Sequence, residues 1–413
     1  MQNEQGNVAV AGGGIAGLSA ALALARTGWR THVFEQVPAF AEVGAGVQLG
    51  PNVTRILRAW GLESELSQRA CQPEWLMARS ALTGDVLACL DLSALAARHG
   101  APYATIHRAD LHALLCQAAL AAGASLHTGC AIDAVSPWPQ GVALRLAMPL
   151  SETPNVFDAA VVADGVWSRL RPSLLADGAP HWSGHIAYRA LMPMSALPVS
   201  MRGHEIMIWM GPDVHLVCYP VSGGERLNVV CLVETGHTGP LPVQDWEQQS
   251  SPEQTRADLH RALRHACPDL RALIDACEGW RWWPLYARPA VRGAHEMVQG
   301  RIALIGDAAH PMLPYLAQGA GMAIEDAQVL AACLHEVAAQ DETRRQAGVP
   351  AALQAFAEAR WARNARVQMG AQRNGHVFHV RGPLRWGRDL GLRLLGASLM
   401  EMPWLYGYVA SSA

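Results

Sequence analysis

Three glycines near the start of the chain have the spacing that a phosphate-binding turn requires. Gly12, Gly14 and Gly17 fit G-x-G-x-x-G between a short apolar run and a helical segment. The first permits a tight turn, the second lets the backbone approach a pyrophosphate, and the third lets helix and strand pack closely. Glu35 ends the next apolar run, where an acid accepts hydrogen bonds from ribose hydroxyls. The pattern predicts a dinucleotide site that suits FAD or NAD better than NADP.

A second group of such residues lies far along the chain. Asp307 stands just beyond the apolar run Ile302–Ile305, where its carboxylate can hydrogen-bond to a polyol such as a ribityl chain. Gly319 and Gly321 then open a helical segment at Met322. A glycine-rich helix N-terminus favours an anion and would stabilise the negative charge of a reduced flavin. Taken alone, this segment could also be an ordinary strand-to-helix turn. Together, the two clusters favour FAD.

The elements that position these residues are visible as periodic segments. Asn7–Ala11 predicts a buried strand, Ile15–Thr27 a helix and Thr31–Glu35 a second strand, which is a β-α-β start. Two further helices are expected at Leu111–Ala122 and Ala320–Val337. Further strands are expected at Ser125–Thr128, Val142–Ala147, Val156–Val162, Glu205–Met210, His215–Tyr219 and Leu227–Val233.

The order of these segments predicts an α/β fold with a β-rich insert. A Rossmann-like FAD-binding domain is expected from residues 1–180 and 290–339, and a β-rich substrate domain from residues 181–289. A helical C-terminal region is expected over residues 340–413. The polar stretch Gln340–Pro350, which contains a glycine and a proline, is the best candidate for a linker.

Composition excludes several classes of partner. The net charge of −3 and the lack of a polybasic block argue against nucleic acid. The nine cysteines include no CxxC pair, so neither a disulfide framework nor a zinc site is expected, and a cytoplasmic location fits best. The uncharged run Val8–Ala25 has no basic residues before it and carries the glycines, so no membrane span is expected. His376 and His379 have no further ligands near them in sequence, so no metal is predicted.

Four motifs together resemble those of one enzyme family, the single-component FAD-dependent aromatic hydroxylases or group A flavoprotein monooxygenases. The nearest members look like 3-hydroxybenzoate 6-hydroxylases and salicylate hydroxylases. The resemblance implies that Asp164 and Arg108 contact FAD, and that the nicotinamide cofactor has no domain of its own. The motifs are GGGIAG at Gly12–Gly17, EVGAGVQLGPN at Glu42–Asn52, ADGVWSRLR at Ala163–Arg171, and GDAAHP at Gly306–Pro311 with its continuation QGAGMAIEDA.

The resemblance implies a monooxygenase reaction. NADH or NADPH reduces FAD, and reduced flavin and O₂ form a C4a-hydroperoxide that hydroxylates a phenolic acid such as a hydroxybenzoate. A phenolic pKa is near ~10, so a base or strong acceptor helps at neutral pH. His215 and Tyr219, four apart on one strand face, resemble the pair that activates the phenol and orients the acid, with Gln318 assisting the histidine. Arg189 is a candidate carboxylate anchor, although it could equally serve the flavin side or nicotinamide docking.

Several alternatives stay open. Tyr315 stands where one type of salicylate hydroxylase carries a histidine base, which weakens salicylate 1-hydroxylation without removing it. A hydroxynicotinate, or a larger quinolone or phenazine, would suit the same fold. An NAD-dependent dehydrogenase would use only the first glycine cluster, and an FAD-fold binding protein resembling the Rab GDP-dissociation inhibitors would show no turnover. The chain is expected to act as a monomer or homodimer.

Overall fold

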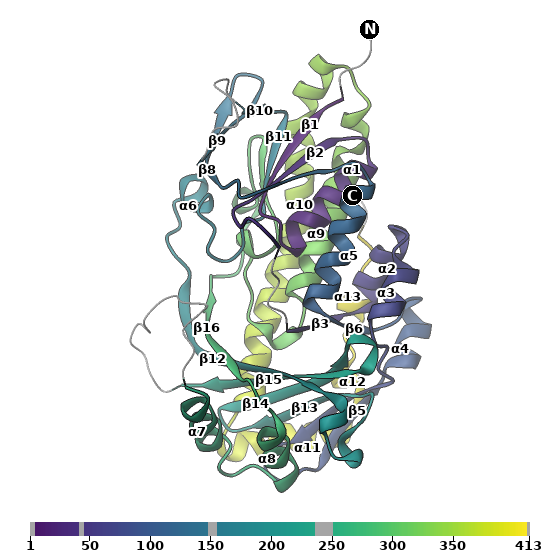
Figure 1. Cartoon of the computed structure of the whole chain (residues 1–413), viewed down its shortest axis with the longest axis vertical. Coiled ribbons are helices and arrows are strands. Elements are labelled where there is room, and N and C mark those ends of the chain that lie inside the picture. The colour runs from purple at the N-terminus through teal and green to yellow at the C-terminus, as the bar shows by residue number, and fades with distance from the viewer. Residues whose placement is uncertain (1–4, 41–44, 148–154, 236–250, 411–413) are drawn as a thin grey trace.

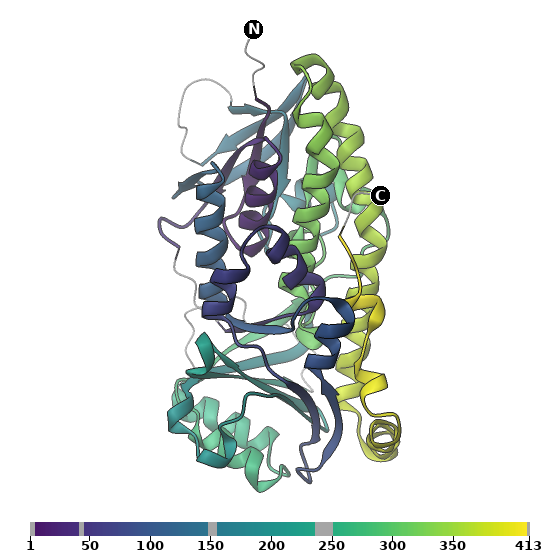
Figure 2. The ribbon, with the colours of Figure 1, turned by 90° about the vertical axis from the view of Figure 1, so that its right-hand side faces the viewer.

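The computed structural model describes residues 5–40, 45–147, 155–235 and 251–410, so Glu42–Gly44 of the second motif lie outside it. Two sheets lie one above the other along the long axis of the molecule (Figure 1). The helix α10 (Glu342–His379) runs along one side past both sheets, as the turned view shows (Figure 2).

The upper sheet is formed by the strands that carry the glycine motifs. Its order is β17-β18-β11-β1-β2-β7, and the five strands from β18 to β7 are parallel. Every motif that follows a parallel strand therefore emerges at the same edge, where open α/β sheets bind ligands. The bounds are β1 (Asn7–Ala11), β2 (Arg30–Glu35), β7 (Ser125–Thr128), β11 (Ala159–Val162), β17 (Val298–Gln299) and β18 (Ile302–Leu304).

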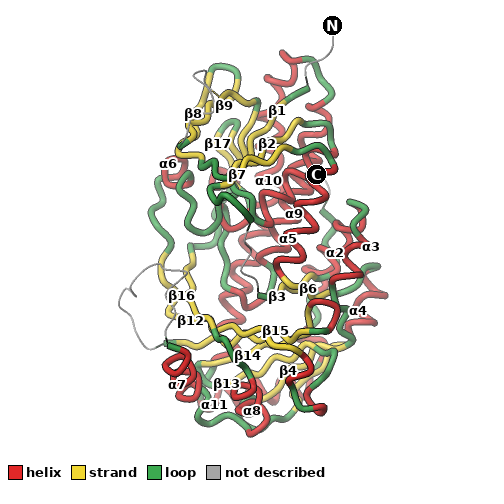
Figure 3. The backbone as a smooth tube through the Cα atoms, in the orientation of Figure 1, coloured by secondary structure: helices red, strands yellow, loops and turns green. Residues whose placement is uncertain are grey.

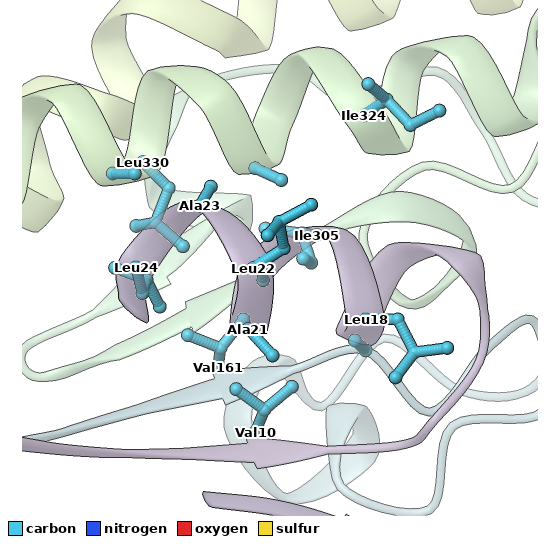
Figure 4. Packing of buried hydrophobic residues seen from close by; sticks show 14 of the residues in the cluster. Val10, Leu18, Ala21, Leu22, Ala23, Leu24, Val161, Ile305, Ile324 and Leu330 are labelled. Atoms are coloured by element: carbon cyan, nitrogen blue, oxygen red, sulfur yellow. The ribbon is translucent and has the colours of Figure 1, made fainter. Parts of the chain in front are cut away.

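Helices cover one face of this sheet. Leu18 and Leu22 of α1 (Ile15–Arg26) pack between sheet residues and Ile324 of α9 (Gly319–Ala338) (Figure 4). Burying each such side chain stabilises the fold by about 1.5–3 kcal/mol. The helix α5 (Arg108–Ala121) packs against α1 as well. The other face is covered by a three-stranded sheet of β8 (Ile132–Trp138), β9 (Gly141–Leu146) and β10 (Asn155–Phe157).

The lower sheet has seven strands in the order β16-β12-β15-β14-β13-β4-β5. The helices α7 (Pro252–Ala262) and α8 (Pro268–Ala276) cover its outer face (Figure 3). Its inner face is turned toward the upper domain and α10. The bounds are β4 (Trp75–Ser80), β5 (Val86–Asp91), β12 (His181–Pro193), β13 (Ile206–Gly211), β14 (Val214–Val221), β15 (Arg226–Glu234) and β16 (Arg281–Ala287).

This sheet corrects one expectation about the domains. Residues 75–91 were expected to belong wholly to the FAD-binding block, yet β4 pairs in parallel with β13, and β5 pairs with β4. The chain thus visits the lower sheet early and returns, which no local pattern signals. The remaining division into domains stays a prediction.

The expected linker at Gln340–Pro350 is also wrong, because most of it lies within α10. Pro350 has no N–H to bond the carbonyl of Gln346 one turn earlier. The guanidinium of Arg301 donates to that carbonyl instead, at 2.5 Å, so the helix continues through the proline.

The remaining elements connect these layers. A two-stranded sheet pairs β3 (Gly46–Leu49) with β6 (Ala104–His107). None of the described helices is long and apolar enough to cross a membrane, and all nine cysteines are free. The other helices are α2 (Pro51–Ala59), α3 (Glu63–Arg69), α4 (Leu92–His99), α6 (Arg171–Leu175), α11 (Gly382–Leu395), α12 (Ala397–Met400) and α13 (Pro403–Tyr406).

Candidate active site

The first glycine cluster forms a tight turn between β1 and α1. Gly12 has a φ of +102°, which favours glycine, and a side chain there would meet the carbonyl of Ala163. A Cβ on Gly17 would lie 1.9 Å from the carbonyl oxygen of Gly12, so only glycine allows this helix to sit so close. Around the Cβ position of Gly14, by contrast, no atom of the described residues lies within 4 Å. The backbone at Gly14 is therefore open to a ligand.

Glu35 lies at the end of β2, beside this turn. Its carboxylate accepts hydrogen bonds from the backbone N–H groups of Gly13, at 2.7 Å, and Val37, at 3.0 Å. The structure thus brings the acid to the glycine turn, as the spacing predicted. A ring nitrogen of His112 lies 2.7 Å from the carbonyl oxygen of Gly13 and fixes the turn from the side of α5.

Asp164 follows β11 and lies against the same turn, since a side chain on Gly12 would also meet its Cα. One of its carboxylate oxygens accepts from the N–H of Arg169, at 2.9 Å, while the other is buried with no hydrogen-bond partner in the described part of the chain. Arg171, from the same motif, donates to the carbonyls of Ala308, at 2.8 Å, and Ala309. The third and fourth motifs are therefore bonded to each other.

Asp307 stands at the end of β18 and is exposed, although protein surrounds it closely. Desolvation raises the pKa of its carboxyl, against the opposing influence of His310 and Arg108. The carboxylate of Asp307 is therefore accessible to a polar ligand, even though most of its surroundings are protein. Arg108, the first residue of α5, comes close enough to both Asp307 and Arg189 to influence their pKa values.

The N-terminus of α9 completes this edge. No described residue has an atom within 4 Å of a Cβ position on Gly319, whereas Gly321 is packed against Val53. Met322 is fully buried beneath the first turn. The amide of Gln318 accepts a hydrogen bond from Asn52 at 3.2 Å, with no bond to His215 among the described residues. Within the described part of the chain, Gln318 is thus hydrogen-bonded to Asn52, and its assistance to His215 stays a prediction.

A buried ionic network supports α9 from behind. The guanidinium of Arg360 on α10 donates to Asp326 and Glu325, both at 2.8 Å, and all three side chains are fully buried. Asp326 also accepts from His310 at 2.5 Å and from the N–H of Gly306 at 3.1 Å. Burial alone would raise the pKa of Asp326, but His310 and Arg360 hold it well below its usual range. His310 therefore positions the fourth motif, as a structural residue.

The inner face of the lower sheet brings three predicted residues together. His215 and Tyr219 lie on this face of β14, both buried. Arg189 on β12 is level with Val217, because both pair with Val230 of the strand between them. Its side chain therefore lies two strands, or roughly 10 Å, to the side of the line from His215 to Tyr219.

Arg189 has no carboxylate partner among the described residues. Its guanidinium stacks on Trp283 at 4.2 Å, and its Nε is buried without a hydrogen-bond partner. Burial, together with repulsion from Arg108, lowers the pKa of Arg189 to about 10, so it stays charged at neutral pH. A partly desolvated cation without a carboxylate partner marks a place where an anion would be stabilised.

Tyr219 marks one end of this face. It lies against Gly46 and Gln48 of the second motif, and Gln48 accepts a 2.8 Å hydrogen bond from Tyr103. Burial raises the pKa of Tyr219, so its hydroxyl keeps its proton. Sequence reasoning missed Gln48 and Tyr103. The first lies inside a recognised motif, but nothing near Tyr103 indicated this contact.

His215 marks the other end and lies in a cluster of rings. Tyr315 and Phe378 lie beside it, with ring centroids at 5.1 and 5.3 Å, and its Nδ1 is 2.8 Å from Nε2 of His379. Burial and the neighbouring histidines hold the pKa of His215 well below its ordinary value, so the ring is neutral. Burial also raises the pKa of Tyr315, which agrees with its poor suitability as a base.

The structure corrects the interpretation of His379. It was expected to lack nearby ligands, yet a nitrogen of His379, a nitrogen of His185 and an oxygen of Glu234 lie within 4.8 Å of one another. Two histidines and a carboxylate are a donor set that zinc accepts. Because these residues come from β12, β15 and α10, no sequence spacing could reveal the cluster.

The residues at the upper edge fit FAD. The open backbone at Gly14 and Gly319 can approach phosphate and flavin atoms, and each position begins a helix whose free N–H groups favour negative charge. The exposed carboxylate of Asp307 and the unpartnered oxygen of Asp164 are acceptors for ligand hydroxyl and N–H groups. These acceptors and donors complement a dinucleotide that carries a polyol.

Comparison with known proteins also indicates an FAD-binding protein. The family model described as an FAD binding domain matches residues 5–367. A 3-amino-4-hydroxybenzoate 2-monooxygenase of Streptomyces platensis is 38% identical over 406 residues, covering 98% of this chain and 96% of the relative. A 3-hydroxybenzoate 6-hydroxylase of Polaromonas naphthalenivorans is 34% identical, with 97% and 96% covered. The solved structure of a salicylate hydroxylase substrate complex superposes with a TM-score of 0.81 at 26% identity, covering 98% of this chain and 96% of that one.

These matches extend over nearly the whole chain and include both sheets. They confirm the resemblance that the four motifs indicated. The chain therefore belongs to the family of FAD-dependent aromatic hydroxylases and is a flavoprotein monooxygenase.

Proposed function

We propose that this enzyme uses NADH or NADPH, together with O₂, to hydroxylate a small phenolic aromatic acid of the hydroxybenzoate type. One observation carries the proposal. The half-buried cation of Arg189, without a carboxylate partner among the described residues, shares a sheet face with the neutral His215 and the protonated Tyr219. This face therefore offers one charged site for an acid and one acceptor for a phenol.

Electrostatics favour an anionic substrate. Arg189 and Arg108 lie close enough to repel each other, so a carboxylate between the sheet and the upper domain would relieve this repulsion. Charge-assisted hydrogen bonds from a guanidinium to a carboxylate are short and about twice as strong as neutral ones. Tyr219 can donate its hydroxyl to the same carboxylate. Trp283 holds the guanidinium plane in place.

The histidine end favours a phenol. A neutral imidazole carries one nitrogen that accepts a hydrogen bond, and a phenol becomes a better nucleophile as its proton moves to such an acceptor. The Nδ1 of His215 is engaged by His379, and its Nε2 has no hydrogen bond within the described part of the chain. Nε2 is thus the atom that would accept the phenolic proton.

FAD, when bound and reduced, supplies the activation of O₂ for transfer of one oxygen atom to the ring. The chain would hold it through the turn at the first motif and the start of α9. The apolar shell of Tyr315, Phe378 and Leu313 would exclude water from the reacting ring. The residues proposed to hold FAD are Gly12, Gly14, Gly17, Glu35, Arg108, Asp164, Asp307, Gly319, Gly321 and Met322.

The relatives support this class of substrate without specifying the compound. Their names give substrates that combine a carboxylate with a ring hydroxyl, in one case with an added amino group. A hydroxynicotinate has the same two groups and remains an alternative. Tyr315, which cannot readily act as a base, continues to disfavour salicylate.

A substrate panel tests the proposal. NADH and NADPH oxidation, O₂ uptake and products would be followed with the mono-hydroxybenzoates, 3-amino-4-hydroxybenzoate and 6-hydroxynicotinate. We expect at least one acid to stimulate oxidation and give a hydroxylated product, and its methyl ester to stimulate far less. A yellow protein that no phenolic acid stimulates would contradict the proposal.

A further inference from the structure

A line of titratable side chains leads from His215 to the protein surface. Nδ1 of His215 is 2.8 Å from Nε2 of His379, the last residue of α10. Nδ1 of His379 is 3.4 Å from a carboxylate oxygen of Glu234 at the end of β15. The histidine side chain is 2% exposed, whereas that of Glu234 is 46% exposed. The contacts thus connect a buried base to a carboxylate in contact with water.

The carboxylate determines which nitrogens carry hydrogen. An ionised carboxylate only accepts hydrogen bonds, so His379 has its proton on Nδ1, facing Glu234. This nitrogen is buried and makes no hydrogen bond among the described residues, and the Glu234 carboxylate lies 3.4 Å from it. Nε2 of His379 then accepts, and Nδ1 of His215 must donate to it. The lone pair of His215 is left on Nε2.

The charged groups around His379 disfavour a lasting positive charge on its ring. His185 on β12, His376 one turn earlier on α10, and Arg388 on α11 all approach it, and Glu234 is the one acid among these neighbours. Burial, followed by the influence of His185, Arg388 and His376, lowers the pKa of His379 to about 3. Because Glu234, at 3.4 Å from Nδ1, is the acidic neighbour of this buried ring, a proton that reaches His379 is favoured to pass to that carboxylate.

We propose that His379 and Glu234 form a relay that carries to solvent the proton which His215 takes from the substrate hydroxyl. The inference rests on the proposed function. The phenolic O–H bond breaks as an N–H bond forms at Nε2 of His215, and the proton on Nδ1 of His215 passes to Nε2 of His379. The proton on Nδ1 of His379 then passes to Glu234 and on to water. No electrons are transferred, and reverse passage resets both rings when the product hydroxyl regains a proton.

In this scheme His379 and Glu234 are positioning and proton-transfer residues that do not touch the substrate. Their removal should therefore affect the rate of proton movement and leave binding largely unchanged. A bound metal ion would instead need Nδ1 of His379, together with His185 and Glu234. Metal binding and the relay exclude each other at this nitrogen, so metal content is part of the test.

The test compares His379→Gln and Glu234→Gln with His376→Gln, an exposed histidine on the same helix. Steady-state rates would be measured across pH with the phenolic acid that best stimulates the wild type. Because positioned proton transfer contributes about 10²–10⁴-fold to rate, we expect kcat of His379→Gln to fall at least ~10-fold at pH 7. Its KM and FAD content should change little, kcat should recover with added imidazole or rising pH, and Glu234→Gln should show the same pattern more weakly.

Three results would overturn the relay. The first is a pH profile in both His379→Gln and Glu234→Gln that equals that of the wild type. The second is a loss of activity in both variants that imidazole does not restore. The third is stoichiometric Zn²⁺ in the wild-type protein that disappears in His379→Gln. Glu234 is exposed, so its variant keeps the test valid if His379→Gln fails to fold. Failure of the proposed function would appear differently, as a wild type that no phenolic acid stimulates.

Discussion

The edge proposed to bind FAD and the face proposed to bind substrate are built in different ways. At the FAD edge, short motifs place backbone groups, and the close approach of Gly17 to Gly12 is made within one turn. At the substrate face, single side chains from separate strands and α10 meet, as His215 and His379 do at 2.8 Å. A cofactor held by backbone leaves a glycine pattern in the sequence. A substrate held by side chains leaves scattered residues that only the tertiary structure brings together.

The largest expected effect distinguishes two glycines of the same motif. In Gly17→Ala, the new Cβ would lie 1.9 Å from a backbone carbonyl, so we expect loss of FAD and of most folded protein. In Gly14→Ala, nothing lies within 4 Å, so the fold should persist while FAD binds more weakly. Thermal unfolding and flavin absorbance after gel filtration would separate the two. If both variants lost FAD and thermal stability to the same extent, Gly17 would not be specific to packing and Gly14 would not be specific to ligand contact.

The next effect concerns the support behind the FAD edge. Arg360→Ala leaves Glu325 and Asp326 buried with reduced compensation, and removing one partner of a buried ion pair costs about 3–5 kcal/mol. Denaturant unfolding would measure this loss. Arg344→Ala is the matched control, because the exposed pair of Arg344 with Asp341 should contribute no more than about 1 kcal/mol. Equal losses in both variants would contradict the role given to the network.

A smaller effect is expected at the substrate face. Arg189→Gln removes the proposed carboxylate partner, and a hydrogen bond to a charged group contributes about 1.5–3 kcal/mol, or roughly 10–100-fold in KM. FAD content should remain, and the exposed Arg202→Gln should behave as the wild type. The effect should be specific to charge, so it should vanish for the methyl ester of the acid. An equal rise in KM for acid and ester would argue against a carboxylate anchor.

Near neutral pH the smallest effect is a pH dependence of stability, which grows only as the solution is acidified. The pKa of His379 in the folded protein, about 3, lies below the ~6.5 of an unfolded histidine. The unfolded state therefore binds more protons between these values, and the free energy of unfolding should fall as pH drops from ~6.5 toward ~3, by up to about 1.4 kcal/mol per pH unit. His379→Gln should flatten this slope, whereas His376→Gln, which removes only a minor influence on the ring, should change it far less. The same slope in all three proteins would exclude a neutral buried His379.

The sequence predicted the FAD edge well because local patterns determine it. The strands at Asn7–Ala11 and Ser125–Thr128 have the predicted bounds, and α9 differs from its prediction by one residue at each end. Glu35 lies where its spacing placed it, beside the glycine turn. At such positions backbone conformation depends on nearby residues, so the pattern carries the information.

The remaining features depend on contacts between distant segments. The early strands of the lower sheet, β4 and β5, were missed because their partner β13 lies far along the chain. Pro350 suggested a break in the helix that Arg301 compensates from outside it. The roles of His379 and Arg360 were equally invisible, because their charged partners come from other elements. Residue type alone does not reveal what a buried side chain faces.

The most direct test of the account is the ratio of hydroxylated product to NADH or NADPH oxidised, measured in wild type and His215→Ala with the best acid of the panel. We predict that the variant keeps FAD and still oxidises the nicotinamide when the acid binds, while product formation falls by about 10²–10⁴-fold. An unchanged rate and yield of product in His215→Ala would contradict the assignment of this face as the substrate site.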